Sequence, residues 1–222
     1  MKNTIIVADT ETIGLPPKNF VFDLGYTVAD KKGNILFEAN HLVEEIVTDG
    51  KLMMGAFYAK KIFSHYLPLV ETGFIDIQPW HIIIEELRDI IATYNINIFS
   101  AYNLGFDMRA MAATQNKLAQ GKILQDKIQL LDLWQFSCEV LLNRPTYKTL
   151  AEQQGWKSPA GNFRTTAEHS YRYISGYYEA EEQHTALCDA RIETKIMSKC
   201  YRQNKKVPYG VFDAHPWRIV NA

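Results

Sequence analysis

The sequence predicts an α/β protein in which a mixed β-sheet is flanked by helices. Two strand-like segments near the start of the chain enclose a reverse-turn sequence, which is the pattern of a hairpin. Further along, strand-like and helix-like segments alternate, which is typical of a sheet with helical connections. No internal repeat or low-complexity segment indicates a repeat array instead.

Three strands are predicted at the N-terminal end. Residues 4–8, Thr-Ile-Ile-Val-Ala, form an apolar run that ends at Asp9. Residues 20–29 and 35–43 are rich in aromatic and β-branched residues, and the Asp-Lys-Lys-Gly-Asn sequence between them has the chemistry of a turn. We therefore expect one strand followed by a hairpin of the same sheet.

Two helices are expected next. Residues 51–66 contain few strong breakers, so we expect them to be helical, with the helix ended by Pro68. Residues 81–94 place Ile83, Leu87 and further apolar side chains at helical spacing, with charged side chains between them. This second helix is expected to cover the sheet.

The second half of the chain alternates between strands and helices. The break Asn103-Leu104-Gly105 follows a strand and precedes a helix that carries Asp107 near its start. The remaining predicted elements are strands at 96–102 and 127–131 and helices from about 132, at 146–154, at about 165–174 and at about 185–203.

The charge balance excludes one class of partner. Lys and Arg number 24, Asp and Glu number 25, and the formal net charge is -1. A protein with so little net charge does not coat duplex DNA through its overall field. An anionic partner must therefore be held by local geometry or by a metal ion.

Cysteine usage and the N-terminal residues indicate a reducing compartment. Cys138, Cys188 and Cys200 lack Cys-x-x-Cys spacing and cannot all pair within the chain, so we expect buried thiols and no thiolate metal site. The apolar stretch before Asp9 is too short for the core of a signal peptide or for a membrane span. We therefore expect a cytoplasmic protein with no membrane partner.

Asp9 and Glu11 are the first candidates for a metal site. Alternate residues of a strand point to the same face, so the two carboxylates would share one small space. At about 4 Å and an effective dielectric constant near 20, like charges repel by roughly 4 kcal/mol, and a hard divalent cation would relieve this repulsion. An isolated Asp-x-Glu is also common in solvated turns, so the interpretation needs further acids.

Asp189 is a further acid with an unusual position. It shares a helical face with Ile192 and Ile196, and an ionised carboxylate on an apolar face needs a cation or a cleft. His184 lies five residues earlier, about 140° away around an ideal helix, so we place it on the loop before the helix. From that loop its imidazole could act as a general base at neutral pH.

Three separated motifs together resemble one enzyme family. The segments are Asp-Thr-Glu-Thr-Ile-Gly-Leu at 9–15, Asn-Leu-Gly-Phe-Asp at 103–107 and His-Thr-Ala-Leu-Cys-Asp-Ala at 184–190. In this order, they are similar to the motifs of the DEDD family of 3′-to-5′ exonucleases. The match is to the histidine-containing DEDDh branch, which includes polymerase proofreading exonucleases and RNase T.

The resemblance implies a ribonuclease H-like fold and a two-metal-ion mechanism. Two Mg²⁺ or Mn²⁺ ions would be held by Asp9, Glu11, Asp107 and Asp189. Asp9 would bridge both ions. Glu11 and Asp189 would complete the coordination of the ion that activates water, and Asp107 would bind the second ion. His184 would accept the proton of the attacking water. Two cations about 3.5 to 4 Å apart stabilise both the attacking and leaving oxygens of a phosphoryl transfer.

The resemblance also implies the substrate. We expect hydrolysis at the 3′ end of single-stranded or frayed DNA, with release of nucleoside 5′-monophosphates, because a recessed site needs a free strand end. An RNA-trimming 3′-to-5′ exoribonuclease of the same chemistry is one alternative, and a non-catalytic nucleic-acid- or protein-binding module on the same fold is another. The oligomeric state stays open.

Two positions depart from the commonest residues of the family motifs. Ile13 stands where a second threonine is frequent, and Tyr102 stands where a histidine is frequent. Neither position is a metal ligand, but both lie beside the residues that contact the terminal nucleotide. Thr10 and Asn103 are therefore weaker candidates for substrate binding.

We expect one exonuclease domain over residues 1–203 and a C-terminal tail over 204–222 that packs back on it. The segment 156–182 is an elaboration in which aromatic and basic residues cluster, either as nucleic-acid contacts or as a helix packed on the core. The pairs Lys60-Lys61 and Lys205-Lys206 could contact phosphates, but isolated basic pairs are usually solvated surface.

Overall fold

The fold, seen in a computed structural model that describes residues 4–14, 18–54, 64, 66–119, 121–180 and 184–222, is built on one six-stranded sheet. The strand order is β4-β3-β2-β1-β5-β6. β1, β2 and β3 are antiparallel, β5 and β6 run parallel to β1, and β4 runs parallel to β3. The strands are β1 Thr4–Ile13, β2 Phe20–Asp30, β3 Ile35–Val43, β4 Asp76–Gln78, β5 Ile98–Ala101 and β6 Gln129–Asp132. The predicted mixed α/β sheet is confirmed.

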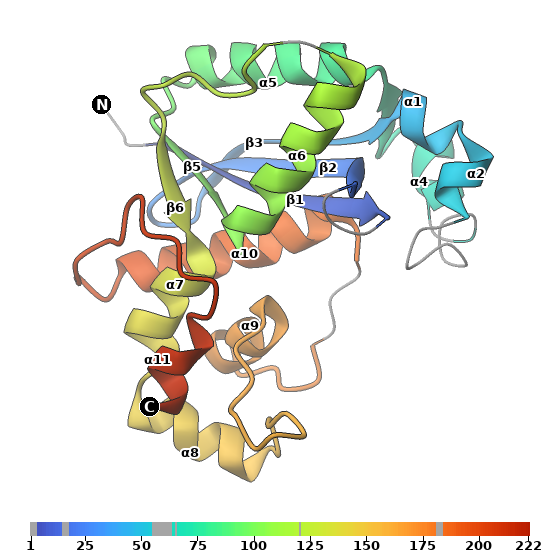
Figure 1. Ribbon diagram of the computed structural model, residues 1–222. Helices are drawn as coiled ribbons and strands as arrows, with labels where there is room; N and C mark the ends of the chain where they lie inside the picture. Colours follow the sequence, from blue (N-terminus) through green and yellow to red (C-terminus); the bar gives the residue numbers. More distant parts are fainter. Residues whose placement is uncertain (1–3, 15–17, 55–63, 65, 120, 181–183) are drawn as a thin grey trace.

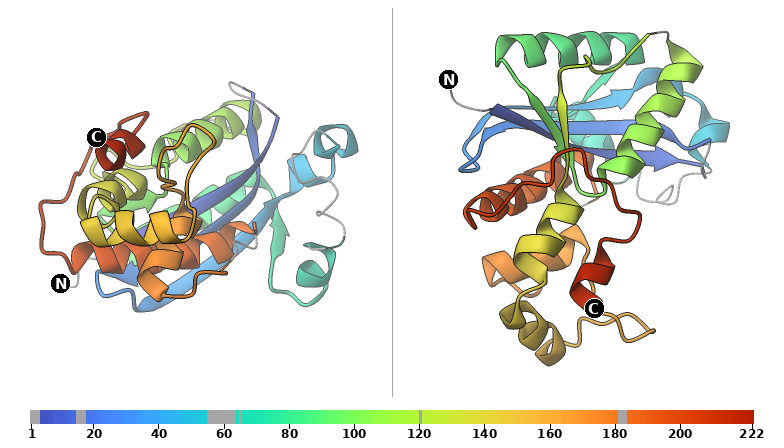
Figure 2. Two further views of the ribbon diagram at one scale, coloured as in Figure 1. Left: turned by 90° about the horizontal axis from the view of Figure 1, so that it is seen from below. Right: turned by 60° about the vertical axis from the view of Figure 1, so that its left-hand side comes forward.

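Helices cover both faces of this sheet (Figure 1). α5 and α6 lie on one face, and α10 and α7 lie on the other, as the two views of Figure 2 also show. Side chains of β1 alternate between two buried clusters, with Ile6 and Ala8 in the first and Ile5 and Val7 in the second. The longer helices are α5 Trp80–Thr93, α6 Leu104–Leu118 and α10 Ala186–Tyr201, and α8 Pro145–Gln153 and α9 Ala167–Ser175 have nine residues each.

The N-terminal strands agree with the sequence except in the length of β1. The hairpin of β2 and β3 lies within one residue of its predicted bounds. β1, however, continues to Ile13, so Asp9 and Glu11 lie inside the strand and not beyond its end. The apolar run at 4–8 is therefore only the first half of the strand, because pairing with β2 continues through both carboxylates.

The segment after β3 also differs from the prediction. Much of the helix expected over 51–66 lies outside the described residues, which show two short helices, α1 Glu44–Val47 and α2 Gly50–Met53. Pro68 does not end a helix. It lies in the first turn of α4 Leu67–Glu71, where its missing N–H group costs no hydrogen bond.

The predicted alternation in the second half is confirmed. α5 begins one residue before its predicted start, and Ile83, Leu87 and Ile91 face the core. The strand β4 was not predicted, because three partly exposed residues carry no detectable alternation. α6 already begins at Leu104, and the helix predicted from about residue 132 consists of α7 Leu133–Ser137 and a π-helical turn, η2 Cys138–Leu142.

The C-terminal residues return along the sheet and end in a helix. The N–H group of Gly210 donates to the carbonyl of Leu130 in β6, and α11 Trp217–Asn221 lies beside η2 in Figure 1. Val220 of α11 is fully buried. Pro208, Gly210, Pro216 and Trp217 predict an extended tail that packs back through its aromatic side chains, so the helix α11 is a correction. Among the described residues, no helix combines the length and apolar character that crossing a bilayer requires.

Candidate active site

The acids Asp9 and Glu11 point toward α10. Residues 5 and 7 of β1 pack in the cluster on the α10 side, so alternation places residues 9 and 11 on that same side. A β-bulge between Glu11 and Thr12 then reverses the alternation, and Ile13 packs in the other cluster. Asp9 and Glu11 therefore lie on the same face of β1, as predicted.

Gly25 allows the first turn of α10 to reach the sheet. Gly25 pairs with Asp9 across β1 and β2. A Cβ atom at this position would lie 2.0 Å from the backbone nitrogen of Leu187, so only glycine permits this approach. The close contact places Asp189, two residues further along α10, against the strand that carries Asp9.

The N-terminus of α10 is held by side chains of β2 and β3. Asp23 Oδ2 accepts a hydrogen bond from the N–H group of Ala186 at 3.0 Å and another from the hydroxyl of Tyr66 at 2.7 Å. Asn40 Oδ1 accepts from the N–H group of Leu187 at 3.3 Å. Burial raises the pKa of Asp23 to about 6. Hydrogen bonds from the Tyr66 hydroxyl, the Ala186 N–H group and the Asn40 side chain act in the opposite direction. These acceptors satisfy helix N–H groups that Thr185, the N-cap residue, does not cap.

Asp107 comes from the other side of the sheet. It lies in the first turn of α6, and Asn103 precedes that helix in a left-handed conformation with φ of 68°. Thr10, on the opposite face of β1 from Asp9, donates its hydroxyl to Asp107 Oδ1 at 2.7 Å. Burial raises the pKa of Asp107 to about 7, while the hydrogen bond from Thr10 lowers it. Thr10 is thus a direct partner of Asp107.

Glu11, His184 and Asp189 form a compact group. One side-chain ligand atom from each lies within 4.8 Å of the others. His184 lies outside the helix, as predicted, with φ of 55°, and its carbonyl accepts a hydrogen bond from Tyr66 at 3.3 Å. Two carboxylates and an imidazole this close are a suitable donor set for a divalent cation.

Asp9 is buried and is repelled by the charges of the other acids. Its pKa is well above the usual range, chiefly because of burial and then because of repulsion from Glu193, Asp107, Asp189 and Glu11, in decreasing order. Two of these acids are on α10 and one is on α6. The structure therefore brings the four predicted acids together from three parts of the chain.

Glu193 is the acid that the sequence reasoning missed. It is 2% exposed and lies one helical turn after Asp189, on the same face of α10. Its Oε2 atom accepts a hydrogen bond from the N–H group of Tyr102 at 3.0 Å. The signal was present in the sequence, because an Asp and a Glu at i and i+4 on an apolar helical face require a common explanation.

A cavity of about 290 Å³ lies beside these acids, and we call it the acidic cavity. Asp9, Asp189 and Glu193 supply its charged lining. Two aromatic residues also line it. The Tyr102 hydroxyl donates to the Thr165 carbonyl at 2.6 Å, and the Trp134 indole donates to the Thr165 hydroxyl at 2.9 Å. Asn103, the weaker substrate candidate, lines the cavity as well.

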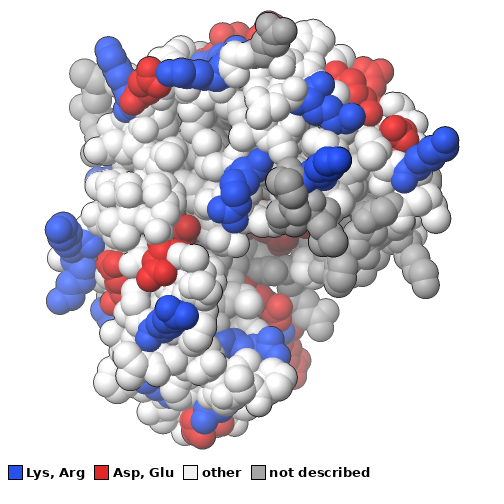
Figure 3. All heavy atoms as spheres, viewed as in Figure 1, with Lys and Arg blue, Asp and Glu red and all other residues white. Residues whose placement is uncertain are grey.

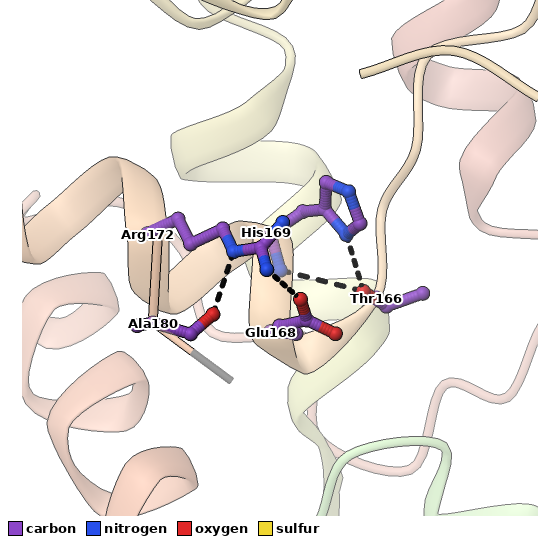
Figure 4. Close-up of polar contacts among 5 residues, drawn as sticks. All are labelled: Thr166, Glu168, His169, Arg172 and Ala180. Atoms are coloured by element: carbon purple, nitrogen blue, oxygen red, sulfur yellow. Dashed lines mark hydrogen bonds and ion pairs between the residues drawn. The ribbon is translucent and has the colours of Figure 1, made fainter. Parts of the chain in front are cut away.

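The elaboration at 156–182 contributes to this cavity, but several of its polar side chains are used within the segment. His169 is buried and its Nδ1 atom lies 2.7 Å from the hydroxyl of Thr166 (Figure 4). Arg172 donates from Nε to the carbonyl of Ala180 at 2.7 Å and forms an ion pair with Glu168. Tyr171, Tyr173 and Ile174 of this segment pack against the core cluster on the α10 side, as the second of the two expectations states.

Comparisons with known proteins agree at the level of the fold. No protein-family model and no curated protein sequence matches the chain. Among solved structures, it is similar to E. coli exonuclease I in a zinc-bound complex with single-stranded DNA, with a TM-score of 0.57 and 13% identity over 92% of this chain and 42% of the other. This chain has the fold of that exonuclease.

Two further exonuclease I structures give the same result. A product-bound form matches with a TM-score of 0.55 and 14% identity over 91% of this chain and 44% of the other. The E. coli enzyme in complex with a dA16 oligonucleotide matches with a TM-score of 0.56 and 13% identity. The match covers 87% of this chain and 39% of the other. The ribonuclease H-like fold is thereby confirmed. The chain spans about two fifths of the length of these structures.

Proposed function

We propose that the protein is a metal-dependent 3′-to-5′ exonuclease of the DEDDh type, which hydrolyses single-stranded or frayed DNA and releases nucleoside 5′-monophosphates. The observation that carries this proposal is the convergence of Asp9, Glu11, Asp107, His184 and Asp189 on one site beside a cavity. Such a group of buried and half-buried acids is costly unless cations bind it. The fold shared with exonuclease I supports the same conclusion.

The donor set fits two hard divalent cations, Mg²⁺ or Mn²⁺. Carboxylate oxygens are the ligands that these ions prefer, and burial raises the pKa of both Asp9 and Asp107, with repulsion from neighbouring acids adding to the shift. Asp9, Glu11, Asp107 and Asp189 would hold the ions. When bound, the ions would stabilise the negative charge that develops on the oxygens of the phosphate.

The remaining roles belong to side chains of the chain itself. His184 stands on a loop at the site, and its imidazole would take the proton of the attacking water. Thr10 fixes the carboxylate of Asp107 through its hydroxyl. Asn103 and Trp134 line the acidic cavity, where they can contact a terminal nucleotide. The single-stranded DNA in the exonuclease I complexes is the reason to name DNA as the first substrate.

An end-labelled assay tests the proposal directly. Single-stranded DNA and RNA, each labelled at the 5′ end, are incubated with magnesium and the products are resolved by length. DNA should shorten one nucleotide at a time, and Asp9→Ala should abolish shortening, whereas Asp89→Asn on the exposed face of α5 should not change it. Faster shortening of RNA would favour the exoribonuclease, and no shortening of either polymer would leave only a binding module.

His184→Ala separates the proposed base from the metal ligands. Activity should fall by about 10²- to 10⁴-fold, the usual contribution of general base catalysis, while calorimetry still detects binding of divalent ions. His81→Ala, an exposed position at the start of α5, is the matched control. Unchanged turnover in His184→Ala would remove this residue from the proposed role.

A further inference from the structure

A second cavity, about 300 Å³ in volume, lies where α9, α10 and the turn between β2 and β3 meet. Its charged lining is wholly basic and consists of Lys32 from the turn and Lys195, Lys199 and Arg202 from α10. All four side chains are exposed. Within the part of the chain that the structure describes, no carboxylate pairs with any of them. We call this site the basic cavity.

The arrangement is held in place by the backbone. The carbonyl of Lys32 accepts hydrogen bonds from the Ser198 hydroxyl at 2.6 Å and from Arg202 Nη2 at 3.2 Å. Gly33, with φ of 85°, packs so closely that an added Cβ atom would lie 2.9 Å from the Cβ atom of Ser198. The turn is therefore fixed on α10, and the cavity exists before any ligand binds.

The chemistry of the lining favours a nucleic-acid strand over a simple anion. Four like charges around one small space repel one another, and the phosphates of a polyanion relieve this repulsion. The ring of Tyr171 also lines the cavity, with Lys195 Nζ 5.1 Å from the ring centroid. An aromatic ring beside cations is the combination that binds single strands, because bases stack on the ring while phosphates contact the cations.

Residues of α9 contribute to both cavities. Ala167 lines the acidic cavity, while Tyr171 and Ile174 line the basic cavity. These three residues are spaced i, i+4 and i+7, so they lie on one face of α9. Along α10, Lys195 and Arg202 lie about 9 and 20 Å beyond Asp189, at 1.5 Å per residue. These distances along the helix axis are within the length of a few nucleotides, so a strand whose end lies at the acids is long enough to extend to the basic cavity.

We propose that the basic cavity binds phosphates of the substrate strand on the 5′ side of the nucleotide being removed. This inference rests on the proposed function for the identity of the strand. Binding there would anchor a long strand while its 3′ end occupies the acidic cavity. A dinucleotide, which is too short to span the distance, would not use it.

Binding without hydrolysis tests the cavity by itself. The affinity for a labelled oligothymidylate of about twenty nucleotides is measured in EDTA between about 50 and 200 mM sodium chloride. Each phosphate contact on a single strand contributes about 0.7 to the slope of log affinity against log salt. Lys195→Gln combined with Arg202→Gln should therefore lower the slope by about 1.4. Lys205→Gln combined with Lys206→Gln is the control, because it removes the same charge from a cavity that also contains Glu139.

Turnover on two substrates completes the test. With magnesium, the Lys195 and Arg202 variant should cleave a dinucleotide at the rate of the unaltered protein and should show a raised KM, with unchanged kcat, on the long strand. Equal loss of affinity in both double variants, or none in either, overturns the basic cavity. If the unaltered protein cleaves neither substrate, the proposed function fails, while the measurement in EDTA still decides whether the cavity binds DNA.

Discussion

Glu193 adds a fifth carboxylate to the four that we propose as metal ligands. Its charge is the strongest of those that oppose ionisation of Asp9, and its Oε2 atom also holds the backbone of Tyr102. In the presence of two divalent ions this extra charge increases attraction, whereas without ions it increases repulsion. In the proposed metal site, Glu193 would therefore lower the stability of the metal-free protein and raise the affinity for cations.

Glu193→Gln separates these two effects. The amide keeps an oxygen acceptor for Tyr102 but loses the charge, so divalent affinity should fall by about tenfold while the metal-free protein melts at a higher temperature. Calorimetry with Mn²⁺ and thermal unfolding in EDTA measure the two quantities. Glu139→Gln, at a distance from the acidic cavity, is the control. A variant that loses both affinity and stability would show a purely structural role.

The raised pKa of Asp107 makes metal binding dependent on pH. With a pKa of about 7, this carboxyl is largely protonated below neutrality in the metal-free protein, and a cation must displace the proton. Magnesium affinity should therefore rise as the pH increases through 7, with release of protons. Calorimetry in buffers of different ionisation enthalpy counts the protons, and Asp107→Asn should reduce the number. Affinity that does not change with pH would contradict the assignment.

At the scale of single residues, the sequence was sufficient to select the candidate acids that lie within recognisable motifs. Asp9, Glu11, Asp107 and Asp189 could each be selected by position and chemistry before the fold was known. Their burial and mutual repulsion could not, because both depend on contacts between distant segments. The partnership of Thr10 with Asp107 likewise depends on which face of β1 meets α6.

At the scale of elements, the position of α10 depends on the absence of a side chain at Gly25. The first turn of the helix packs directly on β2 at this point, and Asp23 and Asn40 complete the contact. Sequence periodicity located α10 to within two residues of each end. It could not show which strand the helix approaches, because a glycine in a strand is compatible with many environments.

Gly25→Ala should displace the start of α10 without altering any proposed ligand. The new methyl group must push the backbone of Leu187 away, which should cost about 1 to 3 kcal/mol of unfolding free energy and weaken divalent binding. Urea unfolding and calorimetry measure these changes. Gly50→Ala is the control, because no atom lies within 4 Å of the added Cβ there. Normal metal affinity in Gly25→Ala would show that the approach of α10 is not needed.

At the scale of the whole molecule, the near-zero net charge conceals a separation of charge. The charged lining of one cavity is acidic and that of another is basic, and residues of α9 line both. On the face drawn in Figure 3, basic and acidic side chains are interspersed, as the composition suggests. Composition argues against coating of duplex DNA by overall charge, but it does not show the local grouping, which forms only when turn, helix and elaboration meet in the fold.

Divalent ions should stabilise the entire fold, because the acids come together only in the native state. At a free metal concentration about a hundred times the dissociation constant, the gain is about 2.7 kcal/mol, which for a chain of this size corresponds to roughly 5 to 10 °C in Tm. Thermal unfolding with magnesium and with EDTA measures the shift. Asp9→Ala should lose most of it, and an equal shift in that variant would place the stabilising ions elsewhere.

The two edges of the sheet have a consequence for behaviour at high concentration. On one side β4 pairs only with His41–Val43, so the first six residues of β3 are an edge without a further strand partner among the described residues. On the other side the returning tail bonds to Leu130 of β6. A covered edge leaves little backbone for a strand from another copy to pair with, so extension of the sheet, the usual first step toward fibrils, is favoured at β3 and not at β6.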